Sequence, residues 1–195
     1  VLGEHKLRAQ NLAFDIDVWY ALVRGHTPDT LFLPLSKAEA EAFVVHYRCW
    51  QGVGRKQGEN VLTDDHFARL LELECRLTAL LRQLDGQAFL RLCGRSAKDC
   101  ILRESKEQFD LRVGQLGGDR YAALTTARQE SMCVRSGSDA MHMLLSSERV
   151  YSDLLDFLEY GEVEQVVLRR WIPEMRLKYE FRCYIRNNAM IACSQ

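Results

Sequence analysis

The sequence predicts an α+β protein, because stretches with helical periodicity alternate with short apolar runs that are typical of β-strands. The longest helical pattern begins after Thr63, and three strand-like runs occupy the last thirty residues. The dipeptide Asn187-Asn188 separates the last two runs, and asparagine tolerates the positive φ of a two-residue hairpin turn. No internal repeat or low-complexity tract interrupts this alternation.

The amino-terminal elements are predicted from local patterns. Residues 11–24 carry apolar side chains at helical spacing, and a short apolar strand is expected at 31–33. Ser36 and Glu39 have the spacing of a capping box, which predicts that a helix begins there and runs to about Trp50.

A long amphipathic helix is predicted after a glycine-rich polar loop at 51–60. Thr63 caps this helix. Its apolar stripe comprises Phe67, Leu70, Leu71, Leu73, Leu77, Leu80 and Leu81. Leucine at helical spacing is what a core requires, so we interpret the stripe as core packing, with a partner-binding face as the alternative.

The middle of the chain is polar, and only parts of it have a clear pattern. A strand is expected at 88–92. Residues 114–120 are rich in glycine but lack the G-x-x-x-x-G-K-[ST] pattern of a phosphate loop, so we expect a surface loop there. Helices are expected at 121–131, from Ser138 onward, and for a further turn or two after Ser147.

The predicted closing sheet consists of three runs, at 166–171, 180–186 and 189–195. In the middle run Glu180 and Arg182 fall on one face, because side chains alternate along a strand. A sheet face built from such charges is a poor core but a good floor for an anionic ligand. A cross-strand ion pair that also includes Arg169 explains the same charges equally well.

Composition narrows the class of protein. The chain has 195 residues, 47% of them hydrophobic and 27% charged, which suits one domain or one and a half of an ordinary globular protein. A formal net charge of −1 argues against a general nucleic-acid binder. No apolar run approaches the roughly 18 residues of a membrane span, and the first residues lack the apolar core of a signal peptide.

The cysteines indicate a reducing compartment. There are seven, none in a C-x-x-C pair and none with clustered histidines beside it. A structural zinc site is therefore not expected. Free thiols among apolar residues are typical of a cytoplasmic protein, and we expect that location.

The segment after the strand at 88–92 has the composition of a phosphate-binding loop. Its cations are Arg91, Arg95 and Lys98, with Gly94 and Ser96 between them. Arginine grips phosphate oxygens in pairs, lysine acts as a point charge, and glycine lets the backbone approach the ligand. Asp99 either holds one of these cations or faces solvent. A solvated loop with ordinary surface charges is the alternative to phosphate binding.

Four sequence blocks occur in an order that is found in a known family. The blocks are Trp19-Tyr20 with 24–27 and 31–35, Phe89–Leu92 with 95–99, Ser147–Tyr151 with 153–154, and 168–171 with 180–183 and 191–195. Together they resemble the cell division cycle protein 123 family. The resemblance covers most of the chain, and its specificity comes from the combination of blocks.

This resemblance implies an ATP-grasp-like architecture, in which nucleotide lies between two α+β lobes with mixed or antiparallel sheets flanked by helices. It implies an amino-terminal lobe at 1–102, with a helical insert at about 36–86 and a phosphate-binding strand and loop at 88–99. Residues 103–195 are then a helical segment and the start of a carboxy-terminal lobe.

The nucleotide site is also implied residue by residue. The first lobe contributes Arg91, Gly94, Ser96 and Lys98, and the second contributes Val167, Leu168, Arg169, Glu180, Arg182 and Gln195. Within that set, the backbone of Val167 and Leu168 is expected to meet an adenine edge, and Arg169 is expected to point towards phosphate. The acidic magnesium ligands of the family lie beyond Gln195, so we predict no metal ligand and no unaided catalysis in this chain.

The sequence departs from the family in three places. Arg91 stands where lysine is frequent, and Ala97 stands where proline is frequent. Two helices occupy 36–86, where the family commonly has an acidic connection, so the partner surface is expected to differ.

The function implied is that of an ATP-binding assembly chaperone for eukaryotic translation initiation factor 2, which contacts the gamma subunit of that factor. We expect a monomer that binds neither nucleic acid nor membrane. Two alternatives remain at this point, an ATP-dependent ligase or kinase of the ATP-grasp type, and a degenerate interaction module that no longer binds nucleotide.

Overall fold

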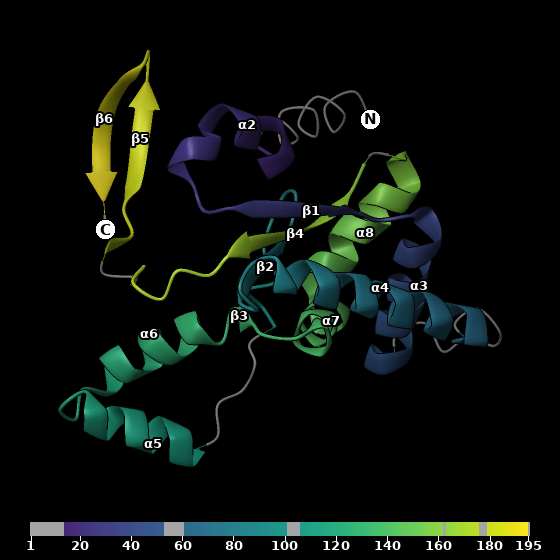
Figure 1. Cartoon of the computed structure of the whole chain (residues 1–195), viewed down its shortest axis with the longest axis horizontal. Coiled ribbons are helices and arrows are strands. Elements are labelled where there is room, and N and C mark those ends of the chain that lie inside the picture. Colours follow the sequence, from purple (N-terminus) through teal and green to yellow (C-terminus); the bar gives the residue numbers. More distant parts are fainter. Residues whose placement is uncertain (1–13, 53–60, 101–105, 162, 176–178, 195) are drawn as a thin grey trace. The chain divides into compact units, whose positions relative to one another are not determined.

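The computed structural model describes residues 14–52, 61–100, 106–161, 163–175 and 179–194. The chain forms two compact units (Figure 1). Unit 1 comprises Val1–Ile101 with Cys133–Trp171, and unit 2 comprises Leu102–Met132 with Ile172–Gln195. The chain thus leaves the first unit close to the predicted boundary at 102/103, but it returns to that unit at Cys133 and stays there until Trp171.

Unit 1 is built on a four-stranded antiparallel sheet with the strand order β1-β4-β2-β3. The strands are β1 (Thr30–Pro34), β2 (Ala88–Leu92), β3 (Cys133–Val134) and β4 (Gln165–Arg170). The predicted strand at 88–92 is confirmed at both ends. In the middle of the sheet Phe32, Val167 and Arg91 are direct register partners, so their side chains lie on one face.

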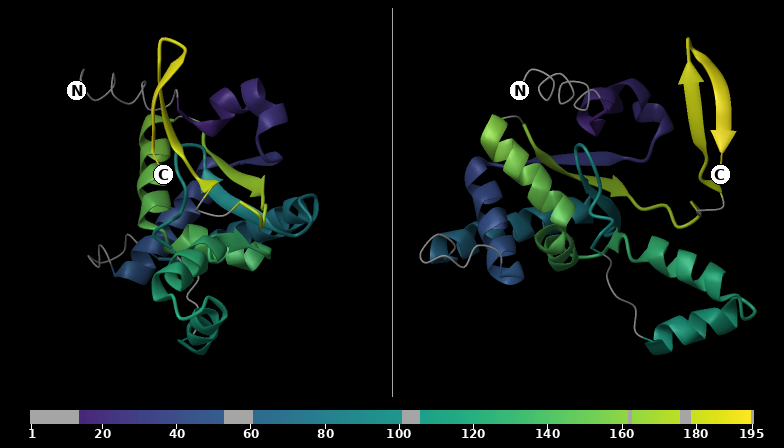
Figure 2. Two further views of the ribbon diagram at one scale, coloured as in Figure 1. Left: turned by 90° about the vertical axis from the view of Figure 1, so that its left-hand side faces the viewer. Right: turned by 180° about the vertical axis from the view of Figure 1, so that it is seen from behind.

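Helices cover both faces of this sheet (Figure 2). The short α2 (Ile16–Val23), which is followed by the 3₁₀ helix η1 (Arg24–His26), lies over the face of Phe32 and Val167. The four longer helices are α3 (Lys37–Gln51), α4 (Asp64–Arg82), α7 (Gly137–Ser146) and α8 (Glu148–Tyr160). Leu90, Leu92 and Leu168 point to the opposite face and are buried there against the helical layer.

Capping residues set the beginnings of the two helices that were predicted from them. The Ser36 hydroxyl accepts a hydrogen bond from the backbone N–H of Glu39, and the Glu39 carboxylate accepts the backbone N–H of Ser36 at 2.7 Å. Thr63 forms the same box with His66. Both boxes satisfy N–H groups that a helix leaves unpaired at its start, and both predicted starts are confirmed.

The apolar stripe of α4 is only partly a core face. Leu70, Leu73, Leu77 and Leu81 are buried. Phe67 and Leu71 are 54% and 63% exposed, so the prediction of core packing is wrong for these two. Leu71 lies about 100° round the helix from Leu70, which turns it away from the sheet, and Phe67 lies in the first turn at the edge of the buried face.

The glycine-rich segment at 114–120 is less open than the predicted surface loop. Helix α5 (Lys106–Gln115) enters it, and α6 (Arg120–Glu130) begins in it, which leaves a turn at 116–118. The Asp119 carboxylate accepts the backbone N–H of Ala122 at 2.9 Å and caps α6. In unit 1, α8 has thirteen residues in place of the predicted turn or two, because Ser147 caps its start and Gly161 ends it at φ 72°.

The predicted closing sheet of three strands is wrong. Strand β4 pairs with β1 and β2 in unit 1, whereas β5 (Arg182–Arg186) and β6 (Ala189–Ser194) pair with each other in a separate two-stranded sheet of unit 2. The turn between them is as predicted, since Asn187 and Asn188 have φ values of 50° and 59°. Periodicity identified each strand but carried no information about its partner.

Two further predictions concern residues outside the described ranges. The predicted glycine-rich loop at 51–60 falls largely outside the described residues, and Gln195 does so entirely. Among the described helices, none combines the length and the hydropathy that crossing a membrane would require.

Candidate functional site

Two arginines on neighbouring strands lie on the same face of the four-stranded sheet. Arg91 of β2 is the register partner of Val167 in β4, and Arg169 lies two residues further along β4. Because side chains two apart on a strand point to the same face, both arginines lie on the side of the sheet that α2 covers. Unit 1 therefore concentrates two positive charges beneath a short helix.

Helix α2 is fixed on this face by a small apolar cluster. Ile16, Cys93 and Val167 are buried together, and the Ile16 backbone N–H donates to the Cys93 carbonyl at 3.2 Å. The partly buried aromatics packed against the cluster are Trp19, Tyr20 and Phe32. This packing removes water from the surroundings of the two arginines and so strengthens local electrostatics.

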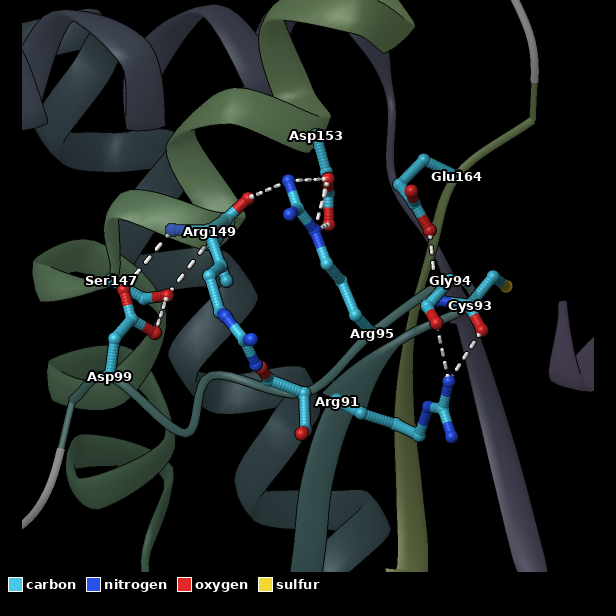
Figure 3. A network of polar contacts seen from close by, with 11 residues as sticks. Arg91, Cys93, Gly94, Arg95, Asp99, Ser147, Arg149, Asp153 and Glu164 are labelled. Atoms are coloured by element: carbon cyan, nitrogen blue, oxygen red, sulfur yellow. Dashed lines mark hydrogen bonds and ion pairs between the residues drawn. The ribbon is translucent and has the colours of Figure 1, made fainter. Parts of the chain in front are cut away.

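Arg91 turns back over the end of its own strand (Figure 3). Its Nε donates to the Leu92 carbonyl at 2.9 Å, and its Nη2 donates to the carbonyls of Cys93 and Gly94 at 2.9 and 2.8 Å. Burial lowers the pKa of Arg91, while the negative charges of Asp15 and Glu164 oppose that shift. The side chain thus organises the turn at Cys93-Gly94. Its Nη1 makes no hydrogen bond within the described part of the chain.

Arg169 is the less satisfied of the two arginines. Its Nη2 donates to the Thr27 hydroxyl, and its Nε is buried without a hydrogen-bond partner among the described residues. Burial lowers the pKa of Arg169, and the positive charge of Arg91 lowers it further. Neither arginine forms an ion pair with a described carboxylate. A buried donor and two like charges are stabilised by an anion that accepts hydrogen bonds from both.

A buried carboxylate holds the other side of the same turn. Glu164 Oε1 accepts the backbone N–H of Cys93 at 3.1 Å and that of Gln165 at 2.9 Å. Burial raises the pKa of Glu164 to about 7, although these hydrogen bonds favour its charged form. Cys93 is therefore clamped at both backbone groups, with Glu164 on its N–H and Arg91 on its carbonyl (Figure 3).

Arg95 was predicted as a third phosphate-binding cation, but its guanidinium is committed to helix α8. Its Nε lies 2.7 and 3.0 Å from the two carboxylate oxygens of Asp153, and its Nη2 lies 2.5 Å from Oδ1 (Figure 3). The hydrogen bond to Asp153 raises the pKa of Arg95. This ion pair ties the loop after β2 to α8.

Asp99 ties the far end of that loop to the start of the same helix. Its Oδ1 accepts the Ser147 hydroxyl at 2.7 Å, and its Oδ2 accepts the backbone N–H of Arg149 at 3.1 Å. These hydrogen bonds lower the pKa of Asp99 against the effect of burial. Asp99 is exposed, as one of the two predicted alternatives has it, and it forms no ion pair with the three cations; its oxygens instead hold the start of α8.

The structure brings together part of the predicted site. Arg91, Val167 and Arg169 share one face, and Gly94 lies at the turn that Arg91 holds. A side chain at Gly94 would approach the Asp15 carboxylate to 3.2 Å, so the turn favours a small residue.

The remaining predicted residues occupy different environments. Ser96 is buried, and its carbonyl accepts a hydrogen bond from Arg149, whereas Lys98 is exposed. Val167 and Leu168 are fully buried, and β1 and β2 flank them on both sides. Glu180 and Arg182 belong to unit 2 and are exposed there, and Gln195 lies outside the described residues. The roles of these residues at a nucleotide stay predictions.

Sequence reasoning missed three residues that shape this region, namely Thr27, Asp153 and Glu164. Each contacts a residue more than fifty positions away in the chain. No local pattern signals such contacts, although Glu164 does stand shortly before the apolar run at 166–168. Within the described residues, no group of three or more histidine, cysteine, aspartate or glutamate side chains could hold a metal ion.

Comparison with known proteins links the carboxy-terminal part of the chain to a known family. The model of the D123 family matches residues 122–195, a segment that includes β4 and the hairpin β5–β6. Over these residues the chain is similar to the D123 family, and the predicted resemblance is confirmed. No curated protein matches the chain closely enough to count as a relative.

Two solved structures are similar to this chain in fold. Both are of Cdc123 from Schizosaccharomyces pombe, and one of them is C-terminally truncated. They are 18% and 19% identical to this chain, with TM-scores of 0.57 and 0.58. Each match covers 95% of this chain but only 62% or 63% of the solved one, so the chain spans less than two thirds of their length. The predicted α+β, ATP-grasp-like fold is confirmed.

Proposed function

We propose that this chain binds ATP and acts as an assembly chaperone of eukaryotic translation initiation factor 2, through the gamma subunit of that factor. This role implies a cytoplasmic protein. The match of residues 122–195 to the D123 family model supports the proposal, and the observation that carries the nucleotide part of it is the arrangement of Arg91 and Arg169. In this proposal the nucleotide is a structural or regulatory ligand, and the described residues act by binding and orienting it.

The two arginines suit a phosphate group for reasons of electrostatics. Both are partly desolvated, each lies near the charge of the other, and neither is ion-paired within the described residues. A phosphate would accept hydrogen bonds from Arg169 Nε and Arg91 Nη1 and would relieve the repulsion between the guanidinium groups. The carbonyls of Cys93 and Gly94 keep Arg91 in place before the ligand arrives, which lowers the entropic cost of binding.

The decisive variant is Arg169→Met, which keeps an apolar stem and removes the guanidinium. We expect ATP affinity, measured by isothermal titration calorimetry with and without magnesium, to fall by about 10- to 150-fold, the scale of a lost charge-assisted contact. The melting temperature of the free protein should not fall, because the removed charge has no carboxylate partner among the described residues.

The matched control is Arg82→Met, which removes an exposed charge at the end of α4, in the helical layer on the other face of the sheet. It should leave ATP affinity unchanged. Equal affinities for the wild-type, Arg169→Met and Arg82→Met proteins would remove Arg169 from the site. No ATP binding by the folded wild-type protein would overturn the nucleotide part of the proposal and favour an interaction module.

The partner is tested separately, by co-purification of the chain with the isolated gamma subunit of the initiation factor. Capture by the wild-type chain and by the Arg82→Met control supports the chaperone role. Failure of capture by a chain that binds ATP would overturn the partner while leaving the nucleotide site intact. An ATP-dependent ligase or kinase would instead be indicated by turnover of ATP in the presence of an acceptor.

A further inference from the structure

Two cysteines face each other across the β5–β6 hairpin of unit 2. Cys183 and Cys193 are direct register partners, and their sulfur atoms lie 3.7 Å apart. Both residues are exposed and both are free thiols. Along β5, Cys183 lies on the same face as Ile185 and on the opposite face from Arg182.

The hairpin already has the geometry that a disulfide needs. Directly opposed residues in an antiparallel pair have Cβ atoms about 4.5–5.5 Å apart, and a disulfide spans about 3.5–4.5 Å between Cβ atoms. A small approach of the strands, with rotation about the two Cα–Cβ bonds, therefore brings the sulfurs into bonding range. No change of register is required. Two thiols alone do not complete the four-ligand shell of a structural zinc site.

We propose that Cys183 and Cys193 are a reversible redox pair that reacts with small-molecule disulfides such as oxidised glutathione. The thiolate of one cysteine attacks a glutathione sulfur, which releases one reduced glutathione and leaves a mixed disulfide on the protein. The thiolate of the other cysteine then attacks the protein sulfur of that mixed disulfide and releases the second glutathione. Two protein thiols lose two electrons, and one glutathione disulfide gains them.

The surroundings of the pair determine when it reacts. The hydrogen bond that joins the two thiols raises the pKa of Cys193. Since the thiolate is the reactive form, formation of the disulfide should become faster as the pH rises above neutrality. This chemistry involves only unit 2 and does not depend on nucleotide binding.

The disulfide would stabilise a structure that is otherwise weak. A hairpin of two strands is marginally stable by itself, and every described residue of β5 and β6 is exposed. A disulfide that closes residues 183–193 restricts the conformations of the open hairpin. This loss of entropy lowers the equilibrium constant for opening by roughly a hundredfold. We expect oxidation to slow amide exchange in β5 and β6 by up to that factor.

To test this, the 195-residue protein is incubated in glutathione buffers of increasing oxidised fraction. The reaction is quenched with acid, the intact mass is measured, and the linked peptides are mapped. The expected product has lost two hydrogens and links the peptides of Cys183 and Cys193. Hydrogen exchange of the oxidised and reduced proteins then measures protection of the hairpin amides, at several pH values.

Two variants keep the result interpretable. Cys193→Ser should convert the internal disulfide into a glutathione adduct on Cys183, and it should lose the oxidation-dependent protection. Cys75→Ser, which removes an exposed thiol of α4, should behave as the wild type does. The proposal would be overturned if both hairpin cysteines of the wild-type protein carried glutathione adducts. It would also be overturned if both stayed reduced in a buffer that oxidises Cys75. A disulfide that leaves hairpin exchange unchanged would overturn it as well.

Discussion

Glu164 provides a direct test of how the turn after β2 is held. Its carboxylate accepts the backbone N–H groups of Cys93 and Gln165, and it is buried enough that its pKa rises from 4.5 to about 7. Replacing Glu164 with Gln keeps an oxygen that can accept both hydrogen bonds and removes the titrating group. The variant therefore separates the cost of burying a charge from the benefit of the two hydrogen bonds.

The magnitude follows from proton linkage. A pKa that is higher in the folded chain means that the folded state retains a proton which the unfolded state loses above pH 4.5. The free energy of unfolding therefore falls as the pH rises from about 4.5 to about 7, and it levels off above that pH. A shift of this size corresponds to at most roughly 3 kcal/mol, since one pKa unit is about 1.36 kcal/mol.

Urea unfolding followed by tryptophan fluorescence measures this effect in the right unit, because Trp19, Trp50 and Trp171 all belong to unit 1. At each pH, the unfolding free energy of the wild type is subtracted from that of Glu164→Gln. The titration of all other groups contributes equally to both proteins and cancels in this difference. Relative to wild type, the variant should gain up to roughly 3 kcal/mol between pH 5 and about pH 7.5.

The control is Glu159→Gln, which removes an exposed carboxylate near the end of α8. Its difference from wild type should show little dependence on pH over the same range. If the Glu164→Gln curve is as flat as that of the control, the carboxylate is hydrated in solution. The clamp on Cys93 would then be an ordinary pair of hydrogen bonds without a buried charge.

Two further predictions concern the packing of the helical layer. Gly137→Ala should cost about 1–3 kcal/mol in the same urea assay, because its Cβ would overlap the Thr78 side chain and the Glu74 carbonyl. Gly25→Ala, which meets open space, should cost little, and equal losses for both variants would refute the clash. Ser147→Ala should cost about 0.5–2 kcal/mol, because the hydroxyl caps α8 and donates to Asp99. Ser152→Ala, on the exposed side of α8, is its control and should cause no loss, because alanine is the better helix former; a similar loss there would refute capping as the cause.

Features that depend on a few neighbouring residues could be predicted from the sequence. The Ser36 and Thr63 boxes and the Asn187-Asn188 turn each rest on contacts that span three residues or fewer. The backbone geometry of a helix start or a hairpin turn fixes such contacts wherever the element occurs. They were therefore confirmed without any knowledge of the surrounding fold.

Features that depend on pairing between distant segments could not be predicted in this way. Strand β4 has the same alternation whether it joins the hairpin or the sheet of unit 1, and only the structure shows the second. The exposure of Phe67 and Leu71 likewise depends on which face of α4 the neighbouring elements cover, and the apolar pattern alone does not define the width of that face. Family resemblance supplied the order of the blocks but not the partners of each strand.

The three cations after β2 show why composition alone does not define a phosphate site. Arg91, Arg95 and Lys98 appear equivalent in the sequence, but among the described residues only Arg95 meets a carboxylate, which Asp153 supplies from α8. Lys98 remains in solvent, and Arg91 is desolvated against backbone carbonyls. A desolvated charge without a counter-ion costs free energy that an apolar residue would not. The hydrogen bonds of Arg91 hold the turn after β2, but they do not neutralise its charge or that of Arg169, whereas an anionic ligand between the two would offset that cost.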